Sequence, residues 1–164
     1  MLRDAQPTDA QALAEISVDG WQTAYVGIVP DDMIARQRPE PLAEYFASDA
    51  ATADGMRTLV SEVGGKVVGF AHAGPLRPEP DEAISGCELW GMYVHSSWRG
   101  QGIGRTLMEA TMDHFRSVGC STAYLWVIRD NLAARRFYEA AGWELDPTAE
   151  RTEPLPEVRY IIST

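Results

Sequence analysis

Residues 94–105 read VHSSWRGQGIGR, which places three glycines within five positions. An apolar stretch at 89–94 precedes this segment, and an amphipathic stretch follows it. The apolar or small side chains of the second stretch have the spacing of one helical face: Ile103, Leu107, Ala110, Thr111, Phe115 and Val118. The pattern predicts a strand, a glycine-rich loop and the start of a helix. Glycine lets the backbone approach a ligand closely, and the first helical turn presents unpaired N–H groups, so the loop suits a phosphate.

The spacing of the glycines decides between the known phosphate-binding motifs. A P-loop closes with Gly-Lys-Ser/Thr, whereas the predicted helix here opens with Gly104-Arg105-Thr106. A dinucleotide fold needs Gly-x-Gly-x-x-Gly and an acid about twenty residues later, and the stretch near Tyr124 offers no such acid. The pattern Arg99-x-x-Gly102-x-Gly104 instead resembles the pyrophosphate-binding signature of the GNAT acyl-CoA N-acyltransferases. A plain tight turn is the alternative interpretation of the same glycines.

Composition limits the class of protein. The 164 residues are 45% hydrophobic and 23% charged, which predicts one soluble domain over 1–164. No stretch approaches the ~18 apolar residues of a membrane span, and the N-terminus lacks the apolar core of a signal peptide. The net charge of −10 argues against a nucleic-acid partner. Residues 99–136 nevertheless hold six arginines and three acids, so they carry +3 and the remainder carries −13.

The two cysteines, Cys87 and Cys120, show no metal-ligand spacing and need no disulfide. We therefore expect no bound metal. A reducing compartment is the simplest location for two unpaired thiols, so the sequence predicts a cytoplasmic protein.

The pattern of the whole chain predicts the order of its elements. Expected strands are 2–5, 56–63, 66–73, 87–94, 122–128, 143–145 and 158–162; expected helices follow a capping box at 8–11 and lie at 31–36, 41–47, 103–118 and 131–141. Gly64-Gly65 is predicted to be a hairpin turn and 75–85 a loop. This order predicts an α/β fold with a mixed sheet and helices on both faces. It is similar to the order of the GNAT fold, which implies a mostly antiparallel sheet of about 6–7 strands with a V-shaped split between its two central strands.

A second motif, NLAARRFYEAAGW at 131–143, resembles the second GNAT motif. Asn131 and Tyr138 are seven residues apart, so they share one helical face about 10 Å apart along the axis. The small Ala134 between them leaves room for a ligand. The resemblance implies that Asn131 hydrogen-bonds the pantetheine arm of acetyl-CoA and that Tyr138 gives a proton to the leaving sulfur. A half-buried structural tyrosine is the alternative for Tyr138.

The resemblance also implies the reaction. Acetyl-CoA is the implied cosubstrate, and its acetyl group passes to a primary amine of a small molecule or peptide by direct attack in a ternary complex. Such a catalyst must align the reactants, supply the neutral amine, and stabilise the oxyanion and thiolate. Main-chain groups of the strand would pair with the pantetheine arm, and the loop would surround the pyrophosphate. These implied contacts are Met92 and Val94 for the arm, and Arg99, Gly100, Gln101, Gly102, Gly104 and Arg105 for the pyrophosphate.

Glu88 is the predicted base, because it matches the catalytic glutamate of GNAT histone acetyltransferases when counted back from the loop. Strand alternation places Glu88, Trp90, Met92 and Val94 on one face, where a carboxylate beside an indole can act as a base. A glutamate that orders the acceptor or pairs with an arginine is an alternative, as is a chain of water molecules. Ribosomal-protein N-terminal acetyltransferases carry their base on the following strand, where this chain has Trp126. That difference argues against this subfamily.

The acceptor pocket of this fold lies between the early helices and the split. Trp21, Tyr25 and Trp126 are therefore candidate pocket walls, with a core role as the alternative. The acidic remainder of the chain favours a cationic acceptor. Two other functions stay open: a catalytically inactive CoA-binding sensor or interaction module, and an acyltransferase that uses another acyl-CoA or a hydroxyl acceptor. GNAT proteins often form homodimers, and the sequence leaves the oligomeric state open.

Overall fold

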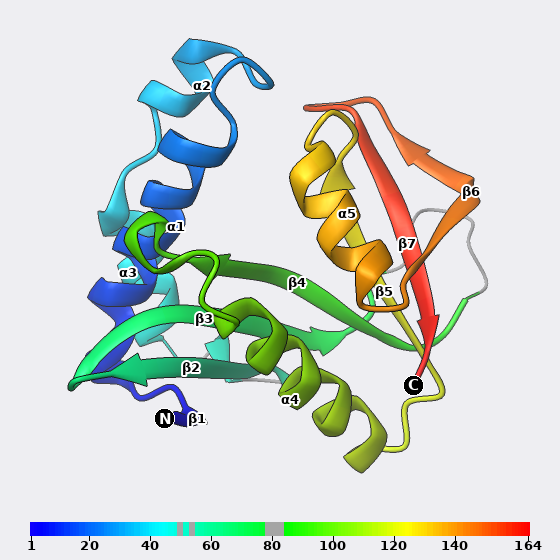
Figure 1. Ribbon diagram of the computed structural model, residues 1–164, viewed down its shortest axis with the longest axis horizontal. Coiled ribbons are helices and arrows are strands. Elements are labelled where there is room, and N and C mark those ends of the chain that lie inside the picture. Colours follow the sequence, from blue (N-terminus) through cyan, green and yellow to red (C-terminus); the bar gives the residue numbers. More distant parts are fainter. Residues whose placement is uncertain (49–50, 53–54, 78–83) are drawn as a thin grey trace.

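The computed structural model describes residues 1–48, 51–52, 55–77 and 84–164. Seven strands form one sheet in the order β1-β2-β3-β4-β5-β7-β6 (Figure 1). The strands are β1 (Leu2–Asp4), β2 (Arg57–Val63), β3 (Lys66–Pro75), β4 (Cys87–Val94), β5 (Thr122–Ile128), β6 (Glu144–Arg151) and β7 (Glu157–Ser163). Only β4 and β5 run parallel among the described strand pairs, which confirms the predicted mixed and mostly antiparallel sheet. Residues 78–83 of the loop predicted at 75–85 lie outside the described part of the chain.

Helices cover both faces of this sheet, as predicted. They are α1 (Ala10–Ala24), α2 (Asp31–Ala35), α3 (Pro39–Ala47), α4 (Ile103–Ser117) and α5 (Leu132–Ala140). On one face, Leu13 and Ile16 of α1 pack against Val60 and Phe70 of the sheet. None of the helices in the described residues is both long and apolar enough to cross a membrane.

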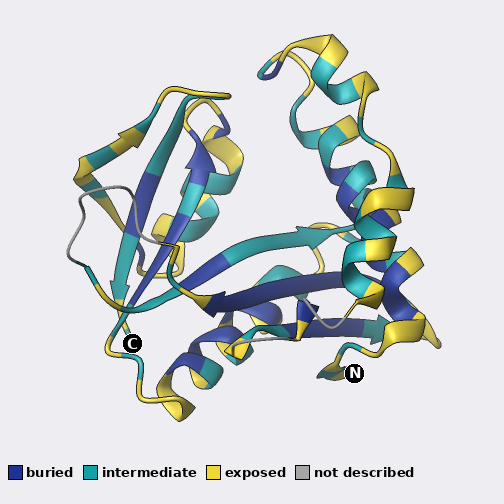
Figure 2. Ribbon diagram, turned by 180° about the vertical axis from the view of Figure 1, so that it is seen from behind, coloured by how far each residue is buried: buried dark blue, intermediate teal, exposed yellow. Residues whose placement is uncertain are grey.

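The larger core lies on the other face of the sheet. Leu107 and Phe115 of α4 are fully buried there against Leu89 and Leu125 of the two central strands. Phe137 of α5 packs against the same cluster. The buried positions of the central strands and the exposed outer surfaces of the helices are visible in Figure 2. The core therefore anchors α4 and α5 on either side of the junction between β4 and β5.

The sheet opens between β4 and β5. Their pairing covers three residue pairs, Cys87–Ala123, Glu88–Tyr124 and Leu89–Leu125. Beyond this point β4 continues along β3, whereas β5 continues along β7. The two central strands therefore diverge into the V predicted from the fold class (Figure 1). Their facing edges carry no strand partner within the described residues.

A β-bulge at Trp90 changes which side chains of β4 share a face. The pairing register with β3 shifts there by one residue, and such a bulge reverses the alternation beyond it. Leu89 before the bulge and Met92 and Val94 beyond it consequently pack on the same core cluster beneath α4. The neighbouring Glu88 lies on the opposite side of the strand. The prediction that Glu88, Trp90, Met92 and Val94 share one face is therefore wrong.

Two local predictions had different outcomes. The capping box predicted at 8–11 lies earlier in the chain, where Gln6 and Asp9 cap a short 3-10 turn at Pro7–Asp9. The backbone N–H of Gln6 donates to the Asp9 carboxylate at 2.7 Å. The hairpin turn predicted at Gly64-Gly65 is confirmed, with φ of +58° and +80° at the two glycines. A two-residue turn with positive φ at both positions has the backbone twist that the right-handed twist of β2 and β3 requires.

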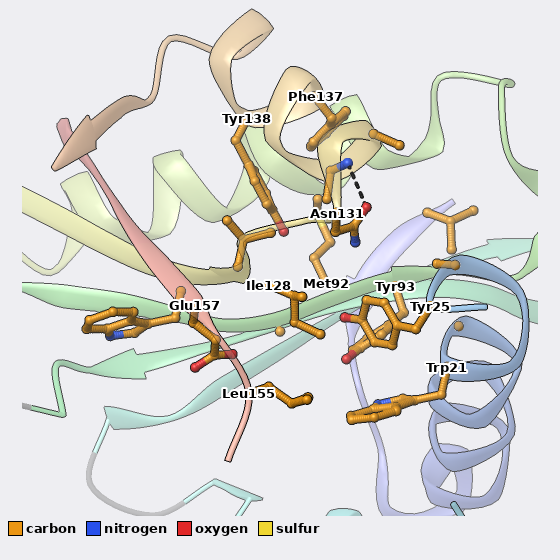
Figure 3. Close-up of a pocket in the computed structure, with 18 of the residues that line it drawn as sticks. Trp21, Tyr25, Met92, Tyr93, Ile128, Asn131, Phe137, Tyr138, Leu155 and Glu157 are labelled. Atoms are coloured by element: carbon orange, nitrogen blue, oxygen red, sulfur yellow. Dashed lines mark hydrogen bonds between the residues drawn. The ribbon is translucent and has the colours of Figure 1, made fainter. Parts of the chain in front are cut away.

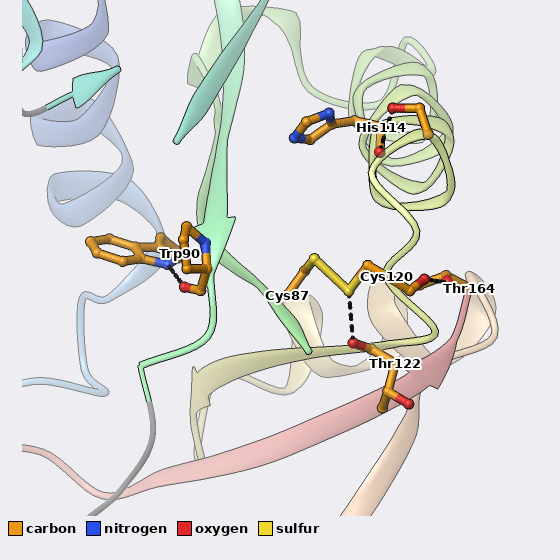
Figure 4. Close-up of a disulfide and its surroundings, with 8 residues drawn as sticks. Cys87, Trp90, His114, Cys120, Thr122 and Thr164 are labelled. Carbon is orange, nitrogen blue, oxygen red and sulfur yellow. Dashed lines mark hydrogen bonds between the residues drawn. A yellow bond between two sulfur atoms is a disulfide. The ribbon is translucent and has the colours of Figure 1, made fainter. Parts of the chain in front are cut away.

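Cys87 and Cys120 form a disulfide at the closed end of the split, with their Cα atoms 6.2 Å apart (Figure 4). The prediction that these cysteines need no disulfide is therefore wrong. Sequence spacing gave no indication, because the contact depends on the fold: Cys87 opens β4, and Cys120 lies just before β5, where these strands pair. The bond closes a chain segment that contains β4, the glycine-rich loop and α4.

Candidate functional site

A cleft of about 490 Å³ occupies the split in the sheet. Its walls come from the C-terminal part of α1, the diverging ends of β4 and β5, one side of α5 and the segment that leads into β7 (Figure 3). Segments far apart in the sequence thus meet around one space. The predicted site residues that line it are Trp21, Tyr25, Met92, Val94, Arg99, Gly104, Trp126, Asn131 and Tyr138.

The glycine-rich loop lies at one end of this cleft. Gly100 and Gly102 have φ of +75° and +83°, which L-residues rarely adopt. Gly102 is the N-cap residue of α4 and has no side chain with which to cap it. The first N–H groups of a helix have no intrahelical partner and lie at the positive end of its dipole. The loop therefore presents bare main-chain N–H groups that can donate hydrogen bonds to an anion.

An aspartate of α1 fixes the beginning of this loop. Asp19 accepts hydrogen bonds from the backbone N–H and the hydroxyl of Ser96, both at 2.7 Å. Arg99 donates to the hydroxyl of Thr23 at 2.7 Å and to the carbonyl of Val94 at 3.0 Å. The Asp19–Ser96 and Thr23–Arg99 contacts join α1 to a loop more than 70 residues later in the chain. No local sequence pattern indicates such a pair, and sequence reasoning missed Asp19.

Asn131 and Tyr138 line the opposite wall. The side-chain oxygen of Asn131 caps α5 by accepting from the backbone N–H of Ala134 at 3.2 Å. Its amide NH2 is thereby turned toward the cleft (Figure 3). The ring of Tyr138 contacts those of Phe137 and Trp143, with centroids 5.5 Å and 6.4 Å away, and its hydroxyl points into the cleft. Burial raises the pKa of this hydroxyl above its ordinary value, so it carries its proton at neutral pH.

Two further tyrosine hydroxyls meet on the α1 side of the cleft. Tyr25, Tyr93 and Trp21 all line the cleft, and the two tyrosine hydroxyls are close enough that each influences the pKa of the other. Burial is the main cause that raises the pKa of both hydroxyls. Trp21 and Tyr25 pack edge to face with ring centroids 4.9 Å apart. The sequence singled out Trp21 and Tyr25 but not Tyr93, whose place in the cleft depends on the bulge in β4.

Glu88 does not reach the cleft. Its carboxylate is fully buried and forms an ion pair with the guanidinium of Arg77. The backbone N–H of Arg77 donates to the same carboxylate at 2.9 Å. The arginine also stacks on Trp90, 4.1 Å from the ring centroid. The geometry thus matches the alternative in which Glu88 pairs with an arginine.

Four predicted pyrophosphate contacts lie outside the cleft lining. Gly100, Gln101 and Gly102 are exposed in the loop itself. Arg105 is exposed on the first turn of α4 and borders a separate groove that α4 forms with α5.

Glu157, at the start of β7, also lines the cleft, and sequence reasoning did not single it out. Within the described residues, no cluster of three or more His, Cys, Asp or Glu side chains suits a metal ion.

Comparison with known proteins assigns these features to one family. The sequence model of the acetyltransferase (GNAT) family matches residues 17–143. The uncharacterized N-acetyltransferase YuaI of Bacillus subtilis is 31% identical over 139 residues, which cover 85% of this chain and 77% of that protein. An aminoglycoside N(6')-acetyltransferase type 1 of Stenotrophomonas maltophilia is 31% identical over 149 residues, covering 87% and 85%. The chain therefore belongs to the acetyltransferase (GNAT) family.

The solved structures agree with this assignment at the level of the fold. The PaiA N-acetyltransferase of Thermoplasma acidophilum, determined in complex with coenzyme A, superposes with a TM-score of 0.78 at 19% identity. The match covers 100% of this chain and 98% of that one. Family membership confirms the predicted enzyme class, an N-acetyltransferase that depends on acetyl-CoA.

Proposed function

We propose that the cleft binds acetyl-CoA and that the protein passes its acetyl group to a primary amine by direct attack in a ternary complex. One observation carries this proposal: the free edge of β4 runs from the closed end of the split to the glycine-rich loop. An extended pantetheine arm can pair with such an edge as an added strand, using main-chain groups of Met92 and Val94. The pyrophosphate then lies at the N-terminus of α4.

Asn131 and Tyr138 would act on the two reactive parts of this ligand. The amide NH2 of Asn131 faces the path of the arm and would donate to one of its carbonyl groups. The substrate amine, after losing one proton to water, attacks the carbonyl carbon of the thioester. As the C–S bond breaks, the sulfur takes the hydroxyl proton of Tyr138. The second proton released from the nitrogen then restores the neutral tyrosine, so protons balance over the cycle.

We propose a structural role for Glu88 in place of the predicted role as base. Its buried carboxylate is paired with Arg77 and has no access to the cleft. Arg77 in turn covers Trp90 at the bulge. This contact stabilises the point at which β4 leaves β5. Water molecules in the cleft would then accept the proton of the amine.

Calorimetry and thiol detection test the proposed function. Titration of the protein with acetyl-CoA is expected to show saturable heat, and a panel of primary amines is expected to release CoA thiol. Binding without thiol release from any amine would support the alternative of an inactive sensor. Melting temperatures measured with equal concentrations of acetyl-, propionyl- and succinyl-CoA rank the acyl groups, because a ligand that binds the folded state more tightly raises the melting temperature more. Absence of heat with acetyl-CoA would contradict the proposal.

Gly102→Ala is expected to weaken acetyl-CoA binding by about tenfold, because a residue with Cβ disfavours the positive φ that aims the loop amides. No atom lies within 4 Å of the position of the added Cβ, so the effect comes from the backbone and not from a clash. Calorimetry measures it. Gly65→Ala is the matched control, since Gly65 has φ of +80°, equally open surroundings and a position in the distant hairpin. Equal acetyl-CoA affinity in both variants would exclude the loop as the pyrophosphate site.

We further propose that residues 1–164 act as one acetyltransferase domain, because a single sheet joins the first strand to the last. A cytoplasmic location fits the use of acetyl-CoA, and fractionation of cells tests it. A small molecule or a peptide is the acceptor class of this proposal. The oligomeric state is open, and a homodimer is the assembly to test for. Light scattering at several protein concentrations measures the assembly directly.

A further inference from the structure

One acidic side chain lies on the acceptor side of the cleft. Glu157 is the first residue of β7 and pairs in register with Ile128 of β5. It is partly buried and is one of the side chains that line the cleft (Figure 3). Among the described residues that line the cleft, Glu157 is the only acid and Arg99 the only base. Arg99 lies at the opposite end, beside the glycine-rich loop.

The hydroxyls of Tyr25 and Tyr93 lie across the cleft from Glu157. The negative charge of Glu157 contributes to the raised pKa of both tyrosines, so the carboxylate and the hydroxyl pair share one electrostatic environment. Tyr138 also contributes to the raised pKa of Tyr25. The hydroxyl of Tyr25 is therefore within electrostatic range of both the proposed acid and the carboxylate. A cation in this part of the cleft meets one charged acceptor and uncharged oxygen acceptors.

The remaining walls of this part of the cleft are apolar or aromatic. They comprise Trp21, Met33, Trp126, Ile128, Pro154 and Leu155. Trp126 is held in place by Arg151, whose guanidinium carbon lies 3.9 Å from the ring centroid. Arg151 also reaches the Glu157 carboxylate at 3.5 Å, the outer limit of a hydrogen bond. A carboxylate offers about four acceptor positions, so this contact leaves capacity for a ligand.

We propose that Glu157 and the Tyr25–Tyr93 pair bind the ammonium group of the acceptor, and that the acceptor is a monocationic primary amine with an apolar or aromatic body. This inference rests on the proposed function. One carboxylate among apolar and aromatic walls matches one ammonium on an apolar body. A polycation such as an aminoglycoside would require further acids, which the described lining residues do not supply.

Acetylation kinetics with 2-phenylethylamine test the role of Glu157. Glu157→Gln is expected to raise the KM for this amine by about 10- to 100-fold. A loss of this size is usual when a hydrogen bond to a charged group is removed. The kcat is expected to change much less, and Glu157→Asp is expected to recover part of the affinity. Arg151→Met is the matched control, because it removes the Arg151–Glu157 ion pair but keeps the Glu157 carboxylate. Its KM is expected to stay within about twofold, since the apolar methionine still packs on Trp126.

Several outcomes would overturn the inference. These are an unchanged KM in Glu157→Gln, an equal rise in Arg151→Met, and a kcat/KM for kanamycin that exceeds that for 2-phenylethylamine. Calorimetry with acetyl-CoA on the same samples separates this failure from failure of the proposed function. A wild-type protein that binds acetyl-CoA but leaves 2-phenylethylamine unmodified refutes the acceptor class alone. A wild-type protein that does not bind acetyl-CoA refutes both proposals.

Discussion

Replacing Tyr138 by phenylalanine is expected to lower kcat for acetyl transfer by about 100- to 1,000-fold, the usual contribution of a positioned general acid. The Kd of acetyl-CoA is expected to stay nearly constant, because phenylalanine keeps the ring contacts with Phe137 and Trp143. Only the hydroxyl that points into the cleft is lost. Stopped-flow detection of the CoA thiol measures the rate, and calorimetry measures the affinity.

Tyr160→Phe is the matched control for this experiment. The hydroxyl of Tyr160 donates to Glu139 at 2.5 Å and accepts from Arg135 at 3.0 Å, and the residue does not line the cleft. Its ring lies in the same layer, with its centroid 6.4 Å from that of Tyr138. We expect the control to retain kcat. Turnover that survives in Tyr138→Phe would remove the proposed acid.

The pH dependence of kcat gives a further expected result for Tyr138. An acid works only while it holds its proton, and burial raises the pKa of this hydroxyl above the ordinary tyrosine value near 10. Activity that depends on this proton is therefore retained as pH rises and is lost only above about pH 10. A profile recorded from pH 7 to 10 should show no alkaline decline caused by Tyr138. A decline near pH 8 that disappears in Tyr138→Phe would contradict the argument.

The local motifs were accessible from the sequence because their physical causes are local. Gly102 needs a positive φ at a helix N-cap, and the spacing from Asn131 to Tyr138 follows from helical geometry. The succession of strands and helices along the chain followed from the alternation of sequence patterns. These causes act over a few residues, so a single sequence displays them.

The errors arose where distant segments decide the geometry. The bulge at Trp90 depends on pairing with β3, and it removed Glu88 from the face on which alternation had placed it. The contact of Asp19 with Ser96 joins residues 77 positions apart. Glu157 reaches the cleft only because β7 pairs with β5. Each of these outcomes follows from tertiary pairing, which a local pattern does not encode.

The same reasoning explains the function of the split. A continuous sheet would occupy both edges of its central strands with neighbours. Here the pairing of β4 with β5 stops after three residue pairs, while α4 and α5 stay anchored in one core. The result is an exposed strand edge in a rigid frame, with main-chain anion donors at one end and a proton donor opposite. A catalyst that works mainly by alignment needs such a fixed arrangement.

Reduction of the Cys87–Cys120 disulfide is expected to lower the free energy of unfolding by about 3 to 4 kcal/mol, the loop-closure value for a separation of 33 residues. Urea unfolding with and without a thiol-free reductant measures the change. At a slope of about 2 kcal/mol per molar urea, the midpoint should fall by roughly 1.5 to 2 M. Acetyl-CoA binding is expected to persist after reduction, because the strand pairs at the closed end of the split do not depend on the sulfur atoms.

The double variant Cys87→Ser/Cys120→Ser is the control that isolates the covalent bond. It should unfold near the midpoint of the reduced protein and should not respond to reductant, because both sulfur atoms are absent. Alkylation of the native protein before unfolding counts its free thiols. Two labelled cysteines in protein never exposed to reductant would contradict the disulfide. A double variant that unfolds at the midpoint of the oxidised protein would show that core packing and strand pairing, and not the covalent bond, hold the segment from β4 to α4.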